Sequence, residues 1–385
     1  MSQQLDIKEG LLHRKRCLEK AKRVVVKVGS AVLTMGTGLN QTVMENLVEE
    51  ISFLRQNGVE VILVSSGAVA AGRRKLGLTN PVLSLREKQA AAAVGQADLI
   101  RFYEKLFELR GIKVAQVLLT HDDLSHRDRY LNVRNTMSTL FDWGILPILN
   151  ENDTVSVKEL RFGDNDNLGA IMTKLSDADG FFCLTDVDGL YTGNPCTNPE
   201  ARPVHTVIEV DKEVEGMAGN ICNTNLGTGG MRSKIIAAKM VAAGGGFSFI
   251  GSGRQQSIFK QLYDGETVGT FFLPHQEIMG SRKHWIAYTL RPKGKLLLDS
   301  GACRALVKNG KSLLPSGILK VHGEFGVGEP IQCCNADGTP IATGLVNYSS
   351  LEISKIQGMQ TSEIEQLIGY KDSDEVIHRD NLVLI

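Results

Sequence analysis

Amide and carboxylate side chains gather in one short stretch of this chain, between segments that otherwise have the composition of a protein core, and six of them are candidates for binding. They are Asn150, Asp153, Asp164, Asn165, Asp166 and Asn167. Asp and Asn are favoured at helix starts, so capping explains one or two of them. The surplus can pair with lysines, accept from an amino group, or donate amide hydrogens to a carboxylate. The stretch therefore predicts a site for a small anionic substrate and a phosphoryl group.

Three familiar functional motifs are excluded by their residue spacing. Asp164-x-Asp166 begins like a calcium-binding EF-hand loop, but leucines stand at its fifth and twelfth positions. His126-Arg127-Asp128 is similar to a protein-kinase catalytic loop, but its asparagine is misplaced and no D-F-G follows. Ser66 lacks the preceding glycine of a nucleophile elbow, so a covalent serine is not predicted.

A glycine-rich segment is the main candidate for phosphate binding. It runs from Gly227 through Thr228, Gly229, Gly230, Met231, Arg232 and Ser233 to Lys234, and a helical pattern follows. Backbone N–H groups at a helix N-terminus attract anions, and Lys234 would reach back from about one turn inside. The segment matches neither the P-loop nor the dinucleotide fingerprint. A glycine-rich loop with a surface lysine remains the alternative.

Lys27 is a second candidate cation, because it lies inside the apolar strand pattern of residues 22–28. Burying an unpaired lysine is costly, so a buried Lys27 requires an anionic partner. Gly29 and Ser30 follow this strand directly, which favours a phosphate site at the strand end. The alternative is an edge strand with Lys27 facing solvent.

Continuous apolar strands alternate with helical patterns in the first two thirds of the chain. Strands are predicted at 22–28, 59–64, 114–119, 145–149, 181–184 and 247–250, and helices at 43–54, 84–110, 131–143, 168–175, 231–243 and 257–263, with a small hairpin or excursion at 155–162. This order is typical of a mostly parallel sheet between two helical layers, a three-layer αβα sandwich. Ligands then bind at the carboxyl ends of the strands, where the polar clusters lie.

The pattern changes after about residue 274. From 285 to 358 the segments are short, β-like and punctuated by glycine, which predicts a second, small, mostly β domain. We predict an N-terminal extension at 1–20, a first domain at 21–274, a linker at 275–290, a second domain at 291–370 and a tail at 371–385.

The bulk composition selects no nucleic-acid or membrane partner, since Lys+Arg and Asp+Glu are equal at 43 each. Seven cysteines without C-x-x-C spacing predict reduced thiols in a cytoplasmic protein rather than a zinc site or disulfide framework. No apolar run reaches about 18 residues, so no membrane span is predicted. The basic N-terminus lacks the apolar core of a signal peptide, and a short solvated helix is expected there.

The ordered motifs resemble the glutamate 5-kinases of the amino-acid kinase family. The resemblance rests on Lys27 to Ser30, Ser65 to Ala68, Asn150 to Asp153, Gly163 to Asn167, Leu184 to Asp186 with Gly189 to Tyr191, and Gly227 to Lys234. The segment from about 291 to 358 resembles the PUA domain that follows the kinase domain in many bacterial members. The family often has Thr-Ser-Gly where this chain has Ser65-Ser66-Gly67, a change that keeps the hydroxyl.

The resemblance implies a role for each matched position. Lys27 and Lys234 would neutralise the transferring phosphoryl group, and Asp166 would hold both lysines. Ser66, Asp153 and Asn165 would bind glutamate, with Asn150 and Asp164 close by. The ATP-binding segments would contain Lys27, Thr185, Asp186 and the residues Thr228, Gly229, Gly230, Met231, Arg232, Ser233 and Lys234.

The implied reaction is ATP-dependent phosphorylation of the γ-carboxylate of L-glutamate, the first step of proline biosynthesis, with proline as inhibitor. Mg²⁺ would bridge the ATP phosphates, without a metal site made by the protein. We further expect a homo-oligomer, dimer or tetramer, and a downstream glutamyl phosphate reductase as a possible partner. One rival is a same-fold kinase for aspartate, N-acetylglutamate, carbamate or UMP. Another is an RNA-binding protein, because nine basic residues and one acidic residue lie between 282 and 320.

Overall fold

An eight-stranded sheet forms the centre of the first part of the chain. The computed structural model describes residues 6–35, 38–80, 82–156, 165–218, 230–275 and 278–385. The strand order is β5-β6-β4-β1-β7-β9-β10-β8, and every neighbouring pair is parallel except β9 and β10. The strands are β1 (Arg23–Val28), β4 (Glu60–Ser65), β5 (Val114–Leu119), β6 (Leu146–Glu151), β7 (Gly180–Thr185), β8 (Thr206–Val207), β9 (Phe247–Ser252) and β10 (Thr270–Phe272). The predicted mostly parallel sheet is confirmed.

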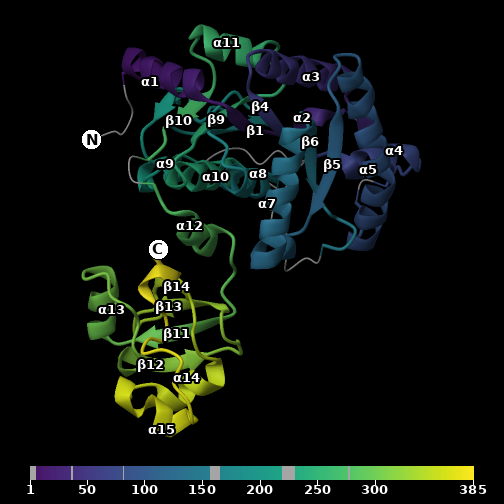
Figure 1. Cartoon of the computed structure of the whole chain (residues 1–385). Helices are drawn as coiled ribbons and strands as arrows, with labels where there is room; N and C mark the ends of the chain where they lie inside the picture. The colour runs from purple at the N-terminus through teal and green to yellow at the C-terminus, as the bar shows by residue number, and fades with distance from the viewer. Residues whose placement is uncertain (1–5, 36–37, 81, 157–164, 219–229, 276–277) are drawn as a thin grey trace. The chain divides into compact units, whose positions relative to one another are not determined.

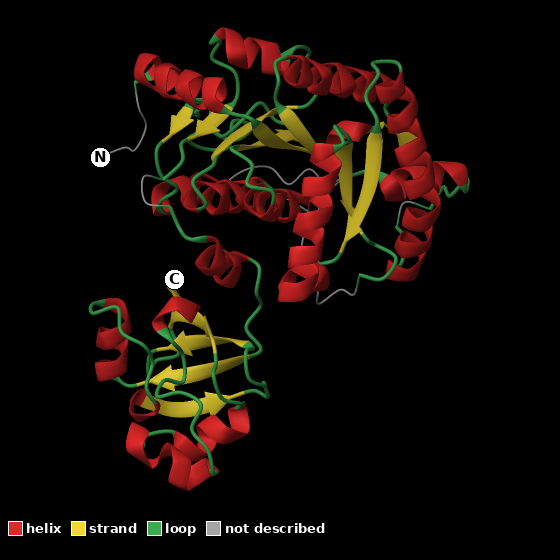
Figure 2. Ribbon diagram, viewed as in Figure 1, coloured by secondary structure: helices red, strands yellow, loops and turns green. Residues whose placement is uncertain are grey.

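Helices cover both faces of this sheet, as the ribbon views show (Figures 1 and 2). Val24, Val26 and Val28 of β1 belong to a core cluster that also holds residues of the helices on one face. Those helices are α3 (Gln41–Gln56), α5 (Leu85–Glu108) and α11 (Ile258–Asp264). The opposite face carries α7 (Arg127–Asp142), α8 (Asn165–Leu175), α9 (Lys212–Ala218) and α10 (Met231–Ala243). Side chains alternate along a strand, so Lys27 projects toward this second layer.

Helix α1 (Ile7–Lys20) is packed against the sheet region rather than solvated as predicted. Leu18 joins the core, and the buried guanidinium of Arg14 donates to the carbonyl of Glu266. A Cβ at Gly10 would lie 2.4 Å from Oγ1 of Thr206, so this helix approaches β8 closely. The helix therefore has one buried face, formed by Gly10, Arg14 and Leu18.

Smaller elements connect the strands. They are α2 (Ser30–Leu33), α4 (Ala68–Lys75), α6 (His121–Ser125) and the β2 (Thr34–Met35) and β3 (Gly38–Leu39) pair. Helix α6 was not predicted. Helix α8 begins three residues earlier than its apolar pattern indicates, because Asn165 and Asp166 belong to its first turn. The predicted hairpin at 155–162 lies mostly outside the described residues.

The chain divides into two compact units, residues 1–278 and 279–385. The second unit contains a five-stranded sheet of order β12-β11-β13-β14-β15. Its strands are β11 (Gly294–Leu298), β12 (Ile318–His322), β13 (Pro330–Cys334), β14 (Pro340–Leu345) and β15 (Leu382–Leu384), and its helices are α12 (Ser281–Tyr288), α13 (Ser300–Val307), α14 (Ser350–Ile356) and α15 (Ile364–Ile368). A small β-rich second domain is thus present, as predicted.

Two segments differ from the predicted linker and tail. Within 275–290, helix α12 buries Ile286 in a cluster with Leu345 and Val383 of the second sheet. Within 371–385, strand β15 pairs with β14 and completes that sheet. Both elements are short and flanked by polar residues, so their few apolar side chains gave no clear local pattern. None of the helices that the structure describes is long and apolar enough to span a bilayer.

Candidate active site

Lys27 is buried in the middle of the sheet. It lies on β1 between Val64 of β4 and Cys183 of β7 in the register, and its residue is 5% exposed. Its Nζ is 2.5 Å from Oδ1 of Asp166, on the first turn of α8. The edge-strand alternative is therefore wrong, because β1 has a neighbour on each side and its lysine has an anionic partner.

Asp166 also contacts Lys234, so one carboxylate joins two lysines that lie far apart in the sequence. Nζ of Lys234, on α10, lies 3.0 Å from Oδ2 of Asp166. Ser233 donates a hydrogen bond of 2.8 Å to the same oxygen. Lys234 is also 5% exposed, so it is not the surface lysine of the alternative interpretation. We call Lys27, Asp166, Ser233 and Lys234 the lysine–aspartate cluster.

The lysine–aspartate cluster keeps Asp166 ionised. Burial alone would raise the pKa of this carboxyl group, but the ammonium groups of Lys27 and Lys234 and the Ser233 hydroxyl together outweigh burial. The pKa of Asp166 is consequently held below its ordinary value. The result is a buried group with two cations and one anion, and thus a net positive charge that favours an anionic ligand.

Cys183 is a member of this site that the sequence did not reveal. Its Sγ lies 3.4 Å from Oδ1 of Asp166, and burial followed by the Asp166 charge raises its pKa to about 12. The thiol is therefore protonated at neutral pH and donates to the carboxylate. Within an apolar strand a cysteine is indistinguishable from any small core residue, so the sequence contained no signal for this contact.

A second polar group surrounds Asn165, the residue that precedes Asp166. The Asn165 amide Nδ2 lies 2.9 Å from Oγ of Ser66 and 3.0 Å from Oδ1 of Asn150. Ser66 follows β4 and Asn150 lies in β6, so the carboxyl ends of two neighbouring strands meet the start of α8. The structure thus brings together three of the predicted glutamate-binding positions. We call Ser66, Asn150 and Asn165 the amide pocket.

Helix α5 contributes two residues to this region that were not predicted. Oε1 of Gln96 accepts a hydrogen bond of 2.9 Å from Asn150 Nδ2. The buried Tyr103 hydroxyl lies 2.9 Å from Oγ of Ser65, next to Ser66. A glutamine directly after the alanine-rich run from Ala90 to Gly95 was the available sequence signal, since a polar residue on a closely packed helix needs a partner.

Of the two other predicted glutamate-binding residues, the described part of the chain includes only Asp153. Asp153 is half-buried in the turn after β6, where its N–H donates to the carbonyl of Glu151 over 3.0 Å. Ser156 anchors this turn through a 2.6 Å hydrogen bond to Oε1 of Glu151. Asp164 lies outside the described residues.

The predicted ATP-binding residues fall in two places. Thr185 ends β7, two residues beyond Cys183, and donates to Asp186 Oδ1 over 3.1 Å. Gly230 precedes α10, Met231 and Lys234 are buried, and Arg232 is exposed. Thr228 and Gly229 lie outside the described residues. Thr185 ends the strand that carries Cys183, a neighbour of Asp166, and Gly230 leads into the helix that carries Ser233 and Lys234 of the lysine–aspartate cluster.

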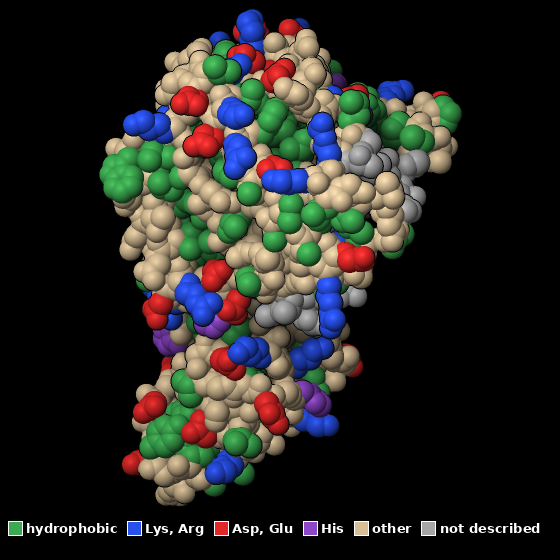
Figure 3. Space-filling view, turned by 90° about the vertical axis from the view of Figure 1, so that its right-hand side faces the viewer, with side chains coloured by type: hydrophobic (Ala, Val, Ile, Leu, Met, Phe, Trp, Pro, Cys, Tyr) green, Lys and Arg blue, Asp and Glu red, His purple; other side chains and the backbone are tan. Residues whose placement is uncertain are grey.

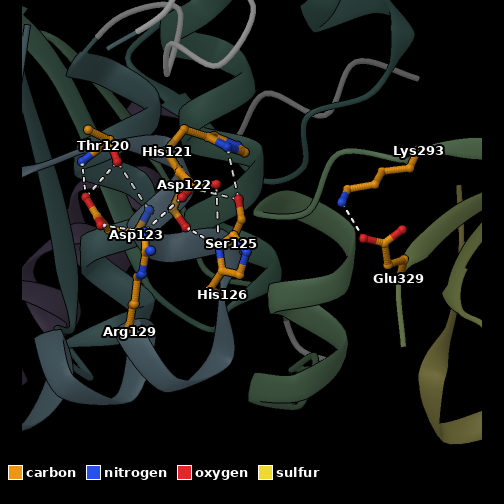
Figure 4. A network of polar contacts seen from close by, with 9 residues as sticks. All are labelled: Thr120, His121, Asp122, Asp123, Ser125, His126, Arg129, Lys293 and Glu329. Carbon is orange, nitrogen blue, oxygen red and sulfur yellow. Dashed lines mark hydrogen bonds and ion pairs between the residues drawn. The ribbon is translucent and has the colours of Figure 1, made fainter. Parts of the chain in front are cut away.

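The carboxyl end of β5 is followed by a capped turn (Figure 4). Thr120 and Asp123 exchange side-chain and backbone hydrogen bonds of 2.8 Å and 3.3 Å, a capping box that starts α6. Arg129 on α7 then bridges Asp122 and Asp123 at 2.8 Å and 3.3 Å. This network fixes the corner beside β6, the strand that carries Asn150.

Comparisons with known proteins agree with this arrangement. The model of the amino acid kinase family matches residues 22–250, and the PUA domain model matches residues 294–368. The glutamate 5-kinase of Desulfotalea psychrophila is 56% identical over 97% of this chain and 99% of its own length. Those of Syntrophus aciditrophicus and Geobacter sulfurreducens are 48% and 50% identical over 97% of this chain, and over 97% and 100% of their own lengths.

These matches cover both structural units, and the kinase model spans the strands and helices that supply Lys27, Asp166 and Lys234. The chain therefore belongs to the glutamate 5-kinases of the amino acid kinase family.

Proposed function

We propose that this protein transfers the γ-phosphoryl group of ATP to the γ-carboxylate of L-glutamate, which forms γ-glutamyl phosphate for proline biosynthesis. The observation that carries the proposal is Asp166 between the two buried lysines, directly after Asn165 of the amide pocket in the chain. The arrangement places a cationic site for phosphate next to a neutral polar site for an amino acid.

The chemistry requires no general base. A γ-carboxylate is already ionised at neutral pH, since the ordinary pKa of a glutamate side chain is about 4.3. Phosphoryl transfer depends mainly on positioning and charge stabilisation. Lys27 and Lys234 offset the negative charge on the transferring group, and Asp166 holds their Nζ atoms in place without carrying a proton.

Magnesium enters this proposal as part of the nucleotide substrate. Asp166 is committed to the two lysines, and the described residues contain no group of three His, Cys, Asp or Glu side chains arranged for a metal. Mg²⁺ commonly keeps its waters and binds substrate phosphates. ATP with its Mg²⁺ would lie near Thr185, Asp186 and the segment before α10.

Trapping of the acyl phosphate tests the proposal. Purified protein is incubated with ATP, Mg²⁺, L-glutamate and hydroxylamine, and we expect γ-glutamyl hydroxamate to accumulate. ADP release with aspartate, N-acetylglutamate, carbamate or UMP in place of glutamate tests the same-fold alternatives, because phosphorylated UMP is not an acyl phosphate and forms no hydroxamate. Folded protein that makes no hydroxamate from glutamate, or that phosphorylates another acceptor faster, would contradict the assignment.

Regulation, assembly and location form the finer part of the proposal. We infer inhibition by proline at the glutamate site, a dimer or tetramer, coupling to a glutamyl phosphate reductase, and a cytoplasmic location where ATP and glutamate are abundant. Adding proline to the trapping assay should raise the KM for glutamate. Light scattering measures the assembly, and a monomeric mass would contradict that part.

RNA binding by the second unit is a second candidate function. Lys295 of β11 lies opposite His322 of β12, and Lys320 is exposed on the same strand pair. However, basic and acidic side chains are interspersed on the face of the molecule shown in Figure 3. Salt-sensitive retention of the full chain on RNA would support this function. If the chain is not retained on RNA even at low salt, RNA binding is excluded.

A further inference from the structure

Gln96 of α5 is connected to the amide pocket through Asn150. The two side chains share one hydrogen bond, in which Asn150 Nδ2 donates to Gln96 Oε1 over 2.9 Å. No role for this glutamine follows from the matched family motifs. Gln96 is half-buried and Asn150 is buried, so water does not readily replace a lost partner of Asn150 Nδ2.

A backbone group determines which way the Asn150 amide faces. The N–H of Glu151 lies 2.9 Å from Asn150 Oδ1, and a backbone N–H can only donate. Oδ1 must therefore face Glu151, and Nδ2 must face Gln96. An asparagine amide can otherwise be placed in two orientations that exchange its oxygen and its nitrogen and have nearly the same shape. Here the hydrogen-bond partners determine the orientation.

The orientation is then transmitted to the neighbouring side chains. Because Asn150 presents Oδ1, Asn165 must present Nδ2 to it, at 3.0 Å. The same Nδ2 donates to Oγ of Ser66 over 2.9 Å and lies 3.3 Å from the carbonyl oxygen of Ser65, which supports the same orientation. Ser66 thus accepts through its oxygen and keeps its hydroxyl hydrogen, while Asn165 keeps Oδ1 as an acceptor. A hydroxyl donor beside an amide acceptor suits the α-carboxylate and the α-ammonium group of an amino acid.

We propose that Gln96 is a substrate-positioning residue, which holds Asn150 and through it Asn165 and Ser66 in the orientation that binds the amino acid. Gln96 supplies the acceptor that completes the set of partners of Asn150. Without it, Asn150 Nδ2 is buried and unsatisfied, and the side chain gains by turning away from Asn165. The inference rests on the proposed glutamate kinase activity.

The first test replaces Gln96 by Met, which has a similar length and helix propensity but lacks the amide acceptor. We expect the KM for glutamate to rise about 5- to 30-fold, the range for leaving one buried donor without a partner. The KM for ATP and kcat should change less than about twofold, because the lysine–aspartate cluster is untouched. Glu104→Met is the matched control, since Glu104 is an exposed residue two turns along the same helix.

A double-mutant cycle with Asn150→Ala separates positioning from direct binding or a packing effect. If Gln96 acts through Asn150, Gln96→Met has little further effect on the glutamate KM once Asn150 is alanine. The proposal would be overturned if the fold change in the glutamate KM of the double variant equalled the product of the two single fold changes. It would also be overturned by an unchanged KM in Gln96→Met. An equal rise in Glu104→Met would also overturn it. Hydroxamate formation by the wild-type protein is measured first, and its absence would refute the proposed function itself.

Discussion

At the scale of single residues, the site depends on one carboxylate with several partners. One carboxylate oxygen of Asp166 forms an ion pair with Lys27. The other forms an ion pair with Lys234 and accepts a hydrogen bond from Ser233. Buried ions are tolerated only when they are paired and hydrogen-bonded, so the three charges are energetically coupled. Each residue-level prediction follows from the removal of one partner or from the burial of the site.

Lys234→Ala should lower kcat by about 10²- to 10³-fold, the effect of losing one charge that stabilises a transition state. Steady-state kinetics with glutamate and ATP measures it. Lys239→Ala is the control, because Lys239 lies on the same helix but pairs with Glu215 at the surface, 2.6 Å away. Equal kcat values for the two variants would show that Lys234 takes no part in transfer.

Asp166→Asn should lower the free energy of unfolding by about 3–5 kcal/mol, because two buried lysines lose their counter-ion. The lowered pKa of Asp166 means that its stabilising contribution is complete above the unfolded value of about 3.9 and is lost as the pH falls through the folded value. Urea titrations should therefore show a constant difference between wild type and variant from about pH 5 to 8. A difference that disappears near pH 6 would contradict this pKa direction.

Thiol labelling should distinguish Cys183 from Cys196. Burial raises the pKa of Cys183 to about 12, and alkylation requires an accessible thiolate. With iodoacetamide at pH 8, peptide mass spectrometry should find Cys196, which is exposed, modified and Cys183 protected. Both should react in urea. Equal modification in the native protein would show that β7 opens to solvent.

At the scale of elements, the amide pocket depends on an unusually close pair of helices. A Cβ at Gly95 of α5 would lie 1.9 Å from the carbonyl oxygen of Ala68 in α4. A Cβ at Gly72 would lie 1.8 Å from the carbonyl oxygen of Ala91. Helix α4 starts directly after Ser66 and Gly67, and Gln96 follows Gly95. The close approach at these glycines therefore sets the positions of Ser66, which lies just before α4, and of Gln96, which contacts Asn150 of the amide pocket.

Gly95→Ala should destabilise the protein by about 1–3 kcal/mol, as overpacking of a tight contact does. It should also raise the KM for glutamate, since the helices must separate. Denaturant unfolding and kinetics measure the two effects. Gly216→Ala in α9 is the control, because nothing lies within 4 Å of a Cβ there and alanine favours helix. Similar changes in both variants would exclude a specific α4–α5 contact.

At the scale of the whole molecule, the two units have separate cores. The cluster built on the second sheet contains residues between 296 and 382, and the smaller cluster of α12 contains residues between 279 and 383. The core of the first sheet contains residues between 18 and 273. Among the described residues, none of these three clusters contains members of both units. Domains with their own cores generally fold as units.

Residues 279–385 expressed alone should therefore unfold in one cooperative transition. Circular dichroism during heating measures it, and α12 must be included because Ile286 packs on Leu345 and Val383. A fragment that starts at residue 291 lacks this helix and should melt at a lower temperature. A gradual, non-cooperative melt of the longer fragment would contradict the independence of its core.

The sequence by itself determined the six long strands of the first sheet and most of the helices between them, because continuous apolar runs and helical spacing are local properties of the chain. The short elements β8, β10, α6 and α9 were not predicted. It also singled out Lys27, Asp166 and Lys234, since charged residues in apolar surroundings and the ordered family motifs are visible without coordinates. The burial of Lys27 was not decided by sequence, because an apolar strand with one lysine fits both an edge and a centre.

Only the tertiary structure decided which distant groups meet. Strand order placed Cys183 beside Lys27, and the close packing of α4 and α5 brought Gln96 to Asn150. Such contacts join residues far apart in the chain, and no local pattern encodes them. Helix α12 and strand β15 were likewise hidden, since their apolar residues gain a core only when the second sheet forms.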